Sequence, residues 1–235
     1  MAATTTTSET LHARTRSGVR PANPRAALWA RLGSFLSMLP LGIWTVNHLW
    51  DNLAVFQGAE AWQRSVTAYP HPLGHALILA MVLLPLLIHT IWGVQRLVSF
   101  HPNTVAYPFF GNWKYIIQRV SAAGVLLFIG AHMWLALLRP RLVEGHAEPF
   151  SNIASWMRFH PPTLMVYIFG TLGVCYHLAN GIFGFAWTWG LTSGERSYKR
   201  VGVISVVAFI ILLAMAWGAI YGLWSAGEAF GPPAT

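Results

Sequence analysis

Long uninterrupted apolar stretches dominate the pattern of hydrophobic and polar positions. Five of them contain no Lys, Arg, Asp or Glu: residues 32–50, 73–95, 120–138, 162–189 and 201–224. Each is long enough for a helix to cross about 30 Å of hydrocarbon, which takes ~18–20 apolar residues. Transmembrane strands would instead alternate over segments of about ten residues, and the sequence lacks that alternation. The pattern therefore predicts an all-α integral membrane protein, a five-helix transmembrane bundle.

Composition supports a membrane protein. Charged residues are 9% of the chain and hydrophobic residues 55%, whereas a soluble domain is about 25% charged. So few charges cannot cover a soluble surface, and they also argue against disorder and nucleic-acid binding despite the net charge of +8. The single cysteine excludes a disulfide framework and every cysteine-based zinc or iron–sulfur site.

The basic residues predict the orientation. Eleven of the fifteen fall on one side of the predicted spans: Arg14, Arg16, Arg20, Arg25, Arg31, Arg96, Lys114, Arg119, Arg196, Lys199 and Arg200. By the positive-inside rule this side is cytoplasmic, so the N-terminus is inside and the C-terminus outside. We divide the chain into a flexible cytoplasmic arm (1–28), a membrane domain (29–225) and a short outer tail (226–235). The Thr-, Ser- and Arg-rich arm would also suit a mitochondrial transit peptide.

Four histidines lie inside predicted spans, one in each of the first four. At 1.5 Å per residue, His48 lies about 25 Å and His132 about 20 Å above the inner face. His89 and His177 each lie about 21 Å below the outer face, which is about 9 Å above the inner one. The spacing predicts an outer pair and an inner pair. Ionisable residues at this depth usually face the bundle interior and mark a functional site.

Two histidines facing each other at one level suit a six-coordinate haem, whose iron takes one imidazole on each axial side. Zinc or copper would need three or four converging ligands. No C-x-x-C-H motif is present, so two non-covalent b-type haems are predicted, with electron transfer as their role. Candidate partners for the haem propionates on the inner side are Arg31, Ser34, Arg96, Gln118, Arg119 and Ser121. Membrane topology explains the basic ones equally well.

Small residues mark one face of the fourth span. Gly170, Gly173, Gly181 and Gly184 share that face with His177. A smooth face would let a flat macrocycle lie against the backbone, and close helix–helix packing is the alternative explanation.

Further motifs accompany the four histidines along the chain. They are Arg31-Leu32-x-Ser34, His48-Leu49, Gly58-Ala59-Glu60-Ala61, Asn112-Trp113-x-x-x-x-Gln118-Arg119-Val120, His177-x-x-Asn180-Gly181, Trp187-Thr188-Trp189-Gly190 and Arg196-Ser197. Together they resemble the dihaem cytochrome b anchor subunit of succinate:quinone oxidoreductases and fumarate reductases. The resemblance covers roughly residues 29 to 222, and it is closest to the single-polypeptide anchors of menaquinone-using bacteria.

This resemblance implies a multi-pass protein of the bacterial cytoplasmic (inner) membrane that anchors a succinate dehydrogenase. It implies that His48, His89, His132 and His177 are the axial ligands of two haem b groups. A flavoprotein with FAD and an iron–sulfur subunit would dock on the cytoplasmic side, and electrons would pass to membrane quinone, with menaquinone favoured. The dicarboxylate chemistry would lie on those partners, because this chain has no nucleotide-binding glycine pattern and no cysteine cluster. A higher oligomer of the complex is compatible with the sequence.

Three alternatives stay open at this point. The chain would equally serve a quinol:fumarate reductase, which runs the reaction in the opposite direction. A cytochrome b subunit of a hydrogenase or formate dehydrogenase also has several spans and histidine-ligated haems. A haem-free transporter with a histidine proton relay belongs to another class.

The quinone site has two candidate positions. Quinone reduction consumes two electrons and two protons, so the site needs a protonatable group near a redox centre. Glu60 follows His48 in the predicted outer loop, with Arg64 four residues on, and is our candidate proton donor and acceptor. A surface Glu–Arg pair is the alternative explanation. The rival position is an inner site near Arg31 and Ser34. For docking, we expect the partners to contact the arm and the cytoplasmic segments 100–114 and 193–200.

Overall fold

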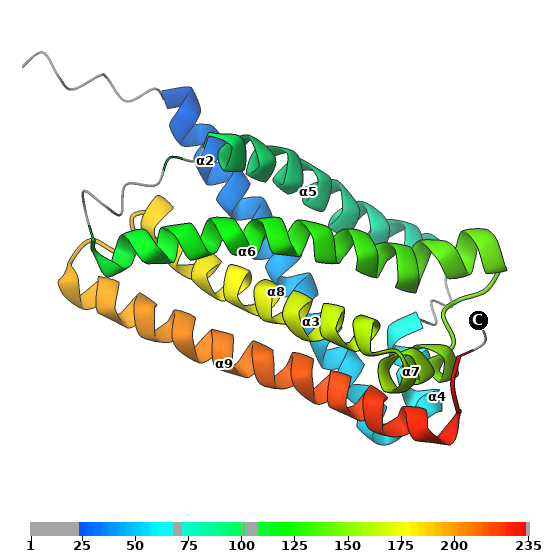
Figure 1. The fold of residues 1–235 in the computed structure, drawn as a ribbon. Helices are drawn as coiled ribbons and strands as arrows, with labels where there is room; N and C mark the ends of the chain where they lie inside the picture. The colour runs from blue at the N-terminus through cyan, green and yellow to red at the C-terminus, as the bar shows by residue number, and fades with distance from the viewer. Residues whose placement is uncertain (1–23, 68–71, 100, 102–107, 234–235) are drawn as a thin grey trace, which may run out of the picture.

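The computed structural model describes residues 24–67, 72–99, 101 and 108–233, and all regular structure in them is helical. Long helices run side by side along one axis (Figure 1), and α8 packs against both α6 and α9. The α-helices are α2 (Pro24–Leu36), α3 (Ile43–Asn52), α4 (Ala59–Trp62), α5 (Pro72–Val98), α6 (Phe110–Met133), α7 (Phe150–Phe159), α8 (Pro161–Thr188) and α9 (Glu195–Ala226). Shorter turns join them: π-helical η1 (Ser37–Gly42), η3 (Gln63–Thr67), η4 (Trp134–Leu138) and η5 (Pro140–Glu144), and 3₁₀-helical η2 (Leu53–Gln57) and η6 (Gly227–Ala229).

Within the described residues, four helical segments are long and apolar enough to cross a membrane: Ala76–Val98, Phe110–Glu144, Pro161–Thr188 and Glu195–Ala229. The remaining predicted span, 32–50, is helical throughout but falls into α2, η1 and α3. Pro40 lies in η1, and a proline inside a helix removes an N–H donor and disturbs the regular ladder. The all-helical membrane fold is therefore confirmed, and the count of five spans stays a prediction.

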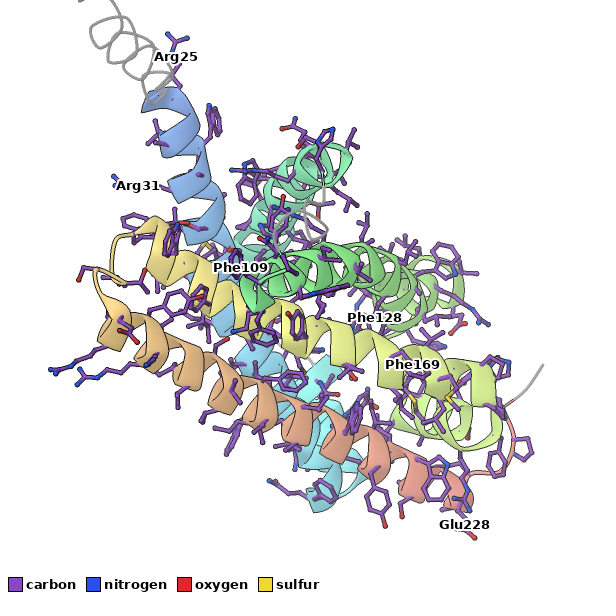
Figure 2. All side chains as sticks on the ribbon, turned by 60° about the vertical axis from the view of Figure 1, so that its left-hand side comes forward. Arg25, Arg31, Phe109, Phe128, Phe169 and Glu228 are labelled. Atoms are coloured by element: carbon purple, nitrogen blue, oxygen red, sulfur yellow. The ribbon has the colours of Figure 1, made fainter. Side chains whose placement is uncertain are left out.

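The two ends of the bundle differ in what they carry. One end, here the inner end, holds the start of α2, the close of α5, the start of α6 and the α8–α9 connection (Figure 1). The other, here the outer end, holds α4, α7 and the close of α9. Figure 2 shows Arg25 and Arg31 toward the inner end and Glu228 at the outer end. The ends match the two sides that the basic residues defined; their orientation in the membrane stays a prediction.

Helices begin inside the segments predicted as the arm and as the docking segments, whose boundaries stay predictions. Helix α2 begins at Pro24, inside the segment assigned to the arm, and residues 1–23 lie outside the description. On the inner side, α6 begins at Phe110 and α9 at Glu195, so parts of the segments 100–114 and 193–200 are helical.

The best-packed core lies at the outer end. It joins η2, α4, α7 and the outer parts of α8 and α9, and its buried members are Ala54, Val55, Trp62, Phe150, Ile153, Ala154, Met157, Tyr167, Ile220 and Leu223. A smaller cluster of Cys175, Leu212 and Ala216 holds the middle of α8 against α9. The outer loops are therefore packed parts of the fold that close that end of the bundle.

Candidate functional site

A cavity of about 660 Å³ runs between the helices, and all four membrane histidines line it. Ligand-binding cavities in proteins have volumes of about 300–1,000 Å³. Its inner end is lined by Ser34, Trp92, Arg96, Gln118 and Arg119, and its outer end by Asn52, Trp62, Thr67, Arg141 and Glu148. The fold thus brings together, on one internal surface, histidines from α3, α5, α6 and α8.

The histidines face each other in two pairs. The ring centres of His48 and His132 are 5.9 Å apart, and those of His89 and His177 are 6.3 Å apart. An imidazole nitrogen lies about 2 Å from a metal that it binds, and its ring centre lies roughly 1 Å further away. Two imidazoles on opposite sides of one metal therefore have ring centres roughly 6 Å apart. Each pair has the spacing that one six-coordinate iron requires.

Aromatic neighbours orient the outer pair. Trp44 stacks on His48 and Phe128 stacks on His132, each one helical turn before its histidine. The Tyr167 hydroxyl lies 3.1 Å from Nδ1 of His132. A hydrogen bond at one ring nitrogen fixes the tautomer and leaves the other nitrogen for a metal.

Polar contacts from α6 and α8 hold the inner pair. The Gln118 amide donates to the backbone carbonyl of His177 at 3.2 Å and accepts from Asn180 at 3.0 Å. The Ser121 hydroxyl lies 3.5 Å from Nδ1 of His177. Trp92 packs at a tilt beside His89, with ring centres 6.0 Å apart. These contacts fix the His177 backbone directly, whereas the neighbours of the His89 ring include Trp92 and the backbone of Gly33.

Two buried polar atoms test whether a polar ligand fits. Among the described residues, Nδ1 of His89 and Nε of Arg119 are the buried side-chain nitrogen or oxygen atoms without a hydrogen-bond partner. Buried polar groups nearly always have partners. Both residues line the inner part of the cavity, and a metal group with anionic side arms would satisfy a histidine and an arginine there. The residues present therefore fit a haem.

The predicted propionate partners divide into two groups. Ser34, Arg96, Gln118 and Arg119 line the cavity, whereas Arg31 and Ser121 do not. Ser34 accepts a hydrogen bond from the indole of Trp189 at 3.1 Å, and the Arg31 guanidinium lies over that same indole ring. Arg31 therefore packs on Trp189 at the surface, beside the cavity mouth.

The glycines of α8 serve two purposes. A Cβ at Gly170 would overlap the ring of Phe128, and one at Gly173 would touch Val125, so these two glycines allow α6 and α8 to approach. Gly181 and Gly184 instead line the cavity beside His177. The glycines in the outer half of α8 therefore allow close helix packing, and those in the inner half give the cavity a smooth wall.

The structure separates Glu60 from the cavity wall. Its side chain is 85% exposed and forms an ion pair of 2.7 Å with Arg64, four residues on. Such exposed pairs contribute little to stability. Three side chains that the sequence analysis did not select lie closer to the histidines or on the cavity wall: Tyr167, Arg141 and Glu148.

Histidines paired across an internal cavity in a helical membrane bundle define a class, the membrane-bound b-type cytochromes. Residues 95–215 match the family model described as "Succinate dehydrogenase/Fumarate reductase transmembrane subunit". The chain is 30% identical over 199 residues to the "Succinate dehydrogenase cytochrome b558 subunit" of Bacillus subtilis (strain 168), which covers 84% of this chain and 96% of that relative. No solved structure matches.

The chain therefore belongs to the succinate dehydrogenase/fumarate reductase transmembrane subunit family. It is a membrane-anchor cytochrome b subunit of this oxidoreductase family and a multi-pass protein of the bacterial cytoplasmic (inner) membrane. This result sets aside the hydrogenase or formate dehydrogenase cytochrome and the haem-free transporter.

Proposed function

We propose that this chain is a single-polypeptide dihaem anchor of succinate:menaquinone oxidoreductase. His48 with His132 would bind an outer haem b, and His89 with His177 an inner one. The observation that carries the proposal is the ring spacing of 5.9 Å and 6.3 Å in two separate pairs on one cavity.

Each haem, when bound, would supply a one-electron carrier, and the two histidines of its pair would hold it. The residues around the histidines prepare the site for that role. Trp44 and Phe128 hold the outer imidazoles by stacking, and Tyr167 directs the free nitrogen of His132 into the cavity. At the inner end, Arg96 and Arg119 supply positive charge for propionates, with Ser34 and Gln118 as uncharged partners on the same wall.

The partners would dock at the inner end. There the succinate-oxidising flavoprotein with FAD, and the iron–sulfur subunit, would deliver electrons first to the inner haem. Large aromatic side chains are exposed at this end, among them Phe109, Phe110, Trp113 and Trp187. Operation in the opposite direction, as a quinol:fumarate reductase, uses the same residues and the same route.

The quinone site is proposed at the outer end of the cavity. Electrons that reach it cross much of the membrane. The membrane potential therefore adds or removes up to ~2.3 kcal/mol per electron for each 100 mV. Glu60 stays our sequence-based candidate for the protonatable group there; if it transfers the proton, Glu60→Gln stops quinone-linked turnover while sparing both haems. The inner site near Arg31 and Ser34 is the alternative, favoured by the hydrogen bond between Ser34 and Trp189 at the cavity mouth.

A purification and a spectrum test the whole proposal. The complex purified through a tag on this chain should contain a flavoprotein and an iron–sulfur protein. Its reduced-minus-oxidised spectrum should show b-type bands equivalent to two haems per chain, and succinate should reduce both. A complex without a b-type band, or with one haem per chain, contradicts the dihaem assignment.

A further inference from the structure

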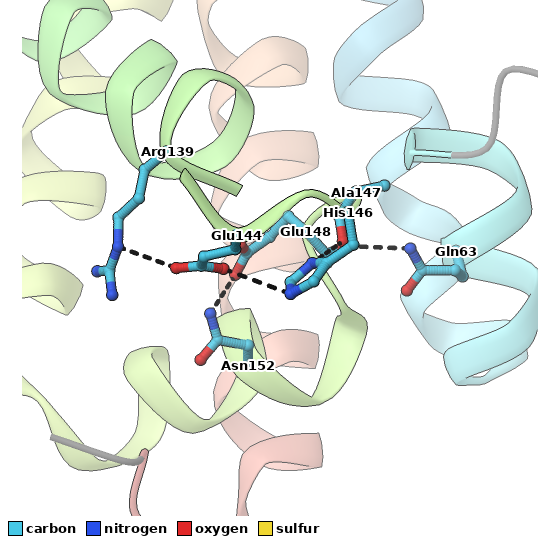
Figure 3. A network of polar contacts seen from close by, with 7 residues as sticks. All are labelled: Gln63, Arg139, Glu144, His146, Ala147, Glu148 and Asn152. Atoms are coloured by element: carbon cyan, nitrogen blue, oxygen red, sulfur yellow. Dashed lines mark hydrogen bonds and ion pairs between the residues drawn. The ribbon is translucent and has the colours of Figure 1, made fainter. Parts of the chain in front are cut away.

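A buried carboxyl lies at the outer end of the cavity. Glu148 is 4% exposed and forms part of the cavity wall. Figure 3 shows its carboxylate accepting a hydrogen bond from the Asn152 amide, at 2.6 Å. Gln63 donates to the backbone carbonyl of Glu148 at 3.0 Å and accepts from the backbone N–H of Phe150 at 2.8 Å. Asn152 therefore holds the carboxyl, and Gln63, from a segment distant in sequence, holds the backbone that carries it.

Charged groups surround Glu148 without pairing with it. Arg139 forms its ion pair with Glu144, at 3.0 Å, and His146 lies 3.6 Å from that same carboxylate (Figure 3). Arg141, from the same connection, donates to the backbone carbonyl of Thr67 and also lines the cavity. No ion pair to Glu148 forms among the residues that the structure describes. From α8, the Tyr167 phenol lies within electrostatic range of the carboxylate.

These surroundings favour the protonated form. Burial raises the pKa of Glu148 above its ordinary value, against the hydrogen bond from Asn152, which lowers it. The charge of Glu144 raises the pKa further, whereas Arg139 and His146 lower it. A carboxyl of this kind can hold and release a proton at a lower cost than an exposed one that stays ionised.

We propose that Glu148 is the group that gives a proton to, and takes it from, quinone at the outer end of the cavity. The proposal rests on the outer quinone site and deepens it. Reduction of one quinone consumes two electrons, supplied by succinate through the complex, and two protons, which form the two quinol O–H bonds. Glu148 donates one of these protons to a quinone oxygen, becomes a carboxylate, and regains a proton from the outer aqueous side, which also supplies the second proton. The same step run backwards serves quinol oxidation.

A physical criterion favours Glu148 over Glu60 as the proton donor. A proton donor must reach the reacting oxygen within hydrogen-bond distance. Glu148 lies on the cavity wall, whereas Glu60 is exposed and ion-paired with Arg64. Glu148 also lies just before α7, where negative charge favours the helix, so the experiment must separate proton transfer from a structural role.

The experiment compares Glu148→Gln with Glu228→Gln in the purified complex. Glu228 is an outer-end carboxylate with a 75% exposed side chain, ion-paired with Arg158. The measured quantity is quinone-linked turnover divided by artificial-dye reduction in the same sample, together with the spectrum of both haems. We expect Glu148→Gln to lower this ratio roughly 100-fold, within the range of general acid–base catalysis. Glu228→Gln should keep the wild-type ratio.

The pH dependence of this turnover ratio distinguishes proton transfer by Glu148 from a structural role. Quinone reduction needs the protonated carboxyl, so the ratio should fall as pH rises through the pKa of Glu148. Asn152→Ala removes a hydrogen bond to the ionised form and should move this fall up by about one pH unit. Glu144→Gln removes a negative neighbour and should move it down. If Glu148→Gln loses the outer haem, these two opposite shifts decide: their presence supports the proposal, and unchanged profiles overturn it.

Other outcomes distinguish a failure of the Glu148 assignment from a failure of the outer quinone site. A wild-type ratio in Glu148→Gln with both haems present overturns the role of Glu148, and loss of turnover in Glu60→Gln would then assign the step to Glu60. A photoreactive quinone that labels the inner end near Ser34 overturns the outer site itself. Labelling at the outer end with an unaffected Glu148→Gln overturns the role of Glu148 alone.

Discussion

The outer and inner ends of the bundle differ in what packs over their helix ends. At the outer end Ala154 and Met157 are fully buried, and α4 and α7 pack over the helix ends. At the inner end Trp187 is 63% and Phe109 68% exposed. Large exposed apolar patches mark interaction sites. A packed core of this chain therefore covers the helix ends at the outer end, although Leu142 there is 75% exposed, and the exposed aromatic rings of the inner end are where we propose that the partner docks.

The two histidine pairs also differ in the side chains that surround them. The outer pair has a hydroxyl partner, Tyr167, at one imidazole, and packed aromatic rings on both histidines. In the inner pair, Nδ1 of His89 has no partner among the described residues, and cationic side chains lie nearby. Metal sites with different neighbours have different reduction potentials. The comparison therefore predicts two haems that can be told apart by titration and by mutation.

The largest expected effect comes from replacing the ligands. His48→Ala or His132→Ala should remove the outer haem and keep the inner one, and His89→Ala or His177→Ala should do the reverse. Each replacement leaves an iron with one protein ligand, so about half of the b-type absorbance should be lost. The measurement is the low-temperature difference spectrum. If His48→Ala and His177→Ala delete the same component, the pairing is wrong.

Cross-linking tests the difference between the two ends. A photoreactive side chain at Trp113 or Trp187 should capture the iron–sulfur subunit in most of the cross-linked product. The same group at the exposed outer-end residue Leu142 should not. Cross-links that fall mainly on Glu60 or on residues 139–159 would contradict docking at the inner end.

A packing change should weaken the outer site more than an equal change elsewhere. Gly170→Ala places a Cβ in the ring of Phe128, which stacks on His132. Such overpacking costs about 1–3 kcal/mol, and the outer haem should dissociate at a lower temperature. Gly124→Ala is the matched control, because no atom lies within 4 Å of its added Cβ. Equal thermal stability of the two variants would show that α6 and α8 adjust without strain.

The smallest expected effect concerns the Tyr167 hydroxyl. A partner at Nδ1 makes a histidine ligand more basic and favours the oxidised iron, so Tyr167→Phe should raise the potential of the outer haem. A net hydrogen bond of about 0.5–1.5 kcal/mol corresponds to roughly 20–60 mV for one electron. A redox titration measures it, with the inner haem of the same sample as the control. An equal shift in both haems would place the effect outside the His132 contact.

The sequence was informative where the signal is local. Charge-free length predicted the helical membrane fold, and counting residues along each span predicted the levels at which the histidines meet. The same counting would also have found Tyr167, which lies six residues after the start of α8 and thus close to the level of His132. No periodic pattern marks Glu148 as buried, because its burial depends on Gln63 and α7 folding over it from segments distant in sequence. The sequence could not show that Glu60 is exposed either. Its i,i+4 spacing to Arg64 is the same whether the helix face points to solvent or to the cavity.

The π-helical turn at Ser37–Gly42 lies between the residues of the inner mouth and His48 on one continuous helical segment. One residue more or less in a helix turns everything beyond it by about 100°. A single-residue deletion in this turn would therefore direct His48 away from His132 while leaving Ser34 in place. Among related chains, we expect insertions and deletions to accumulate in the connections between helices and to be absent from residues 37–42. We therefore expect related chains that keep this histidine to keep the length of the turn that sets its direction.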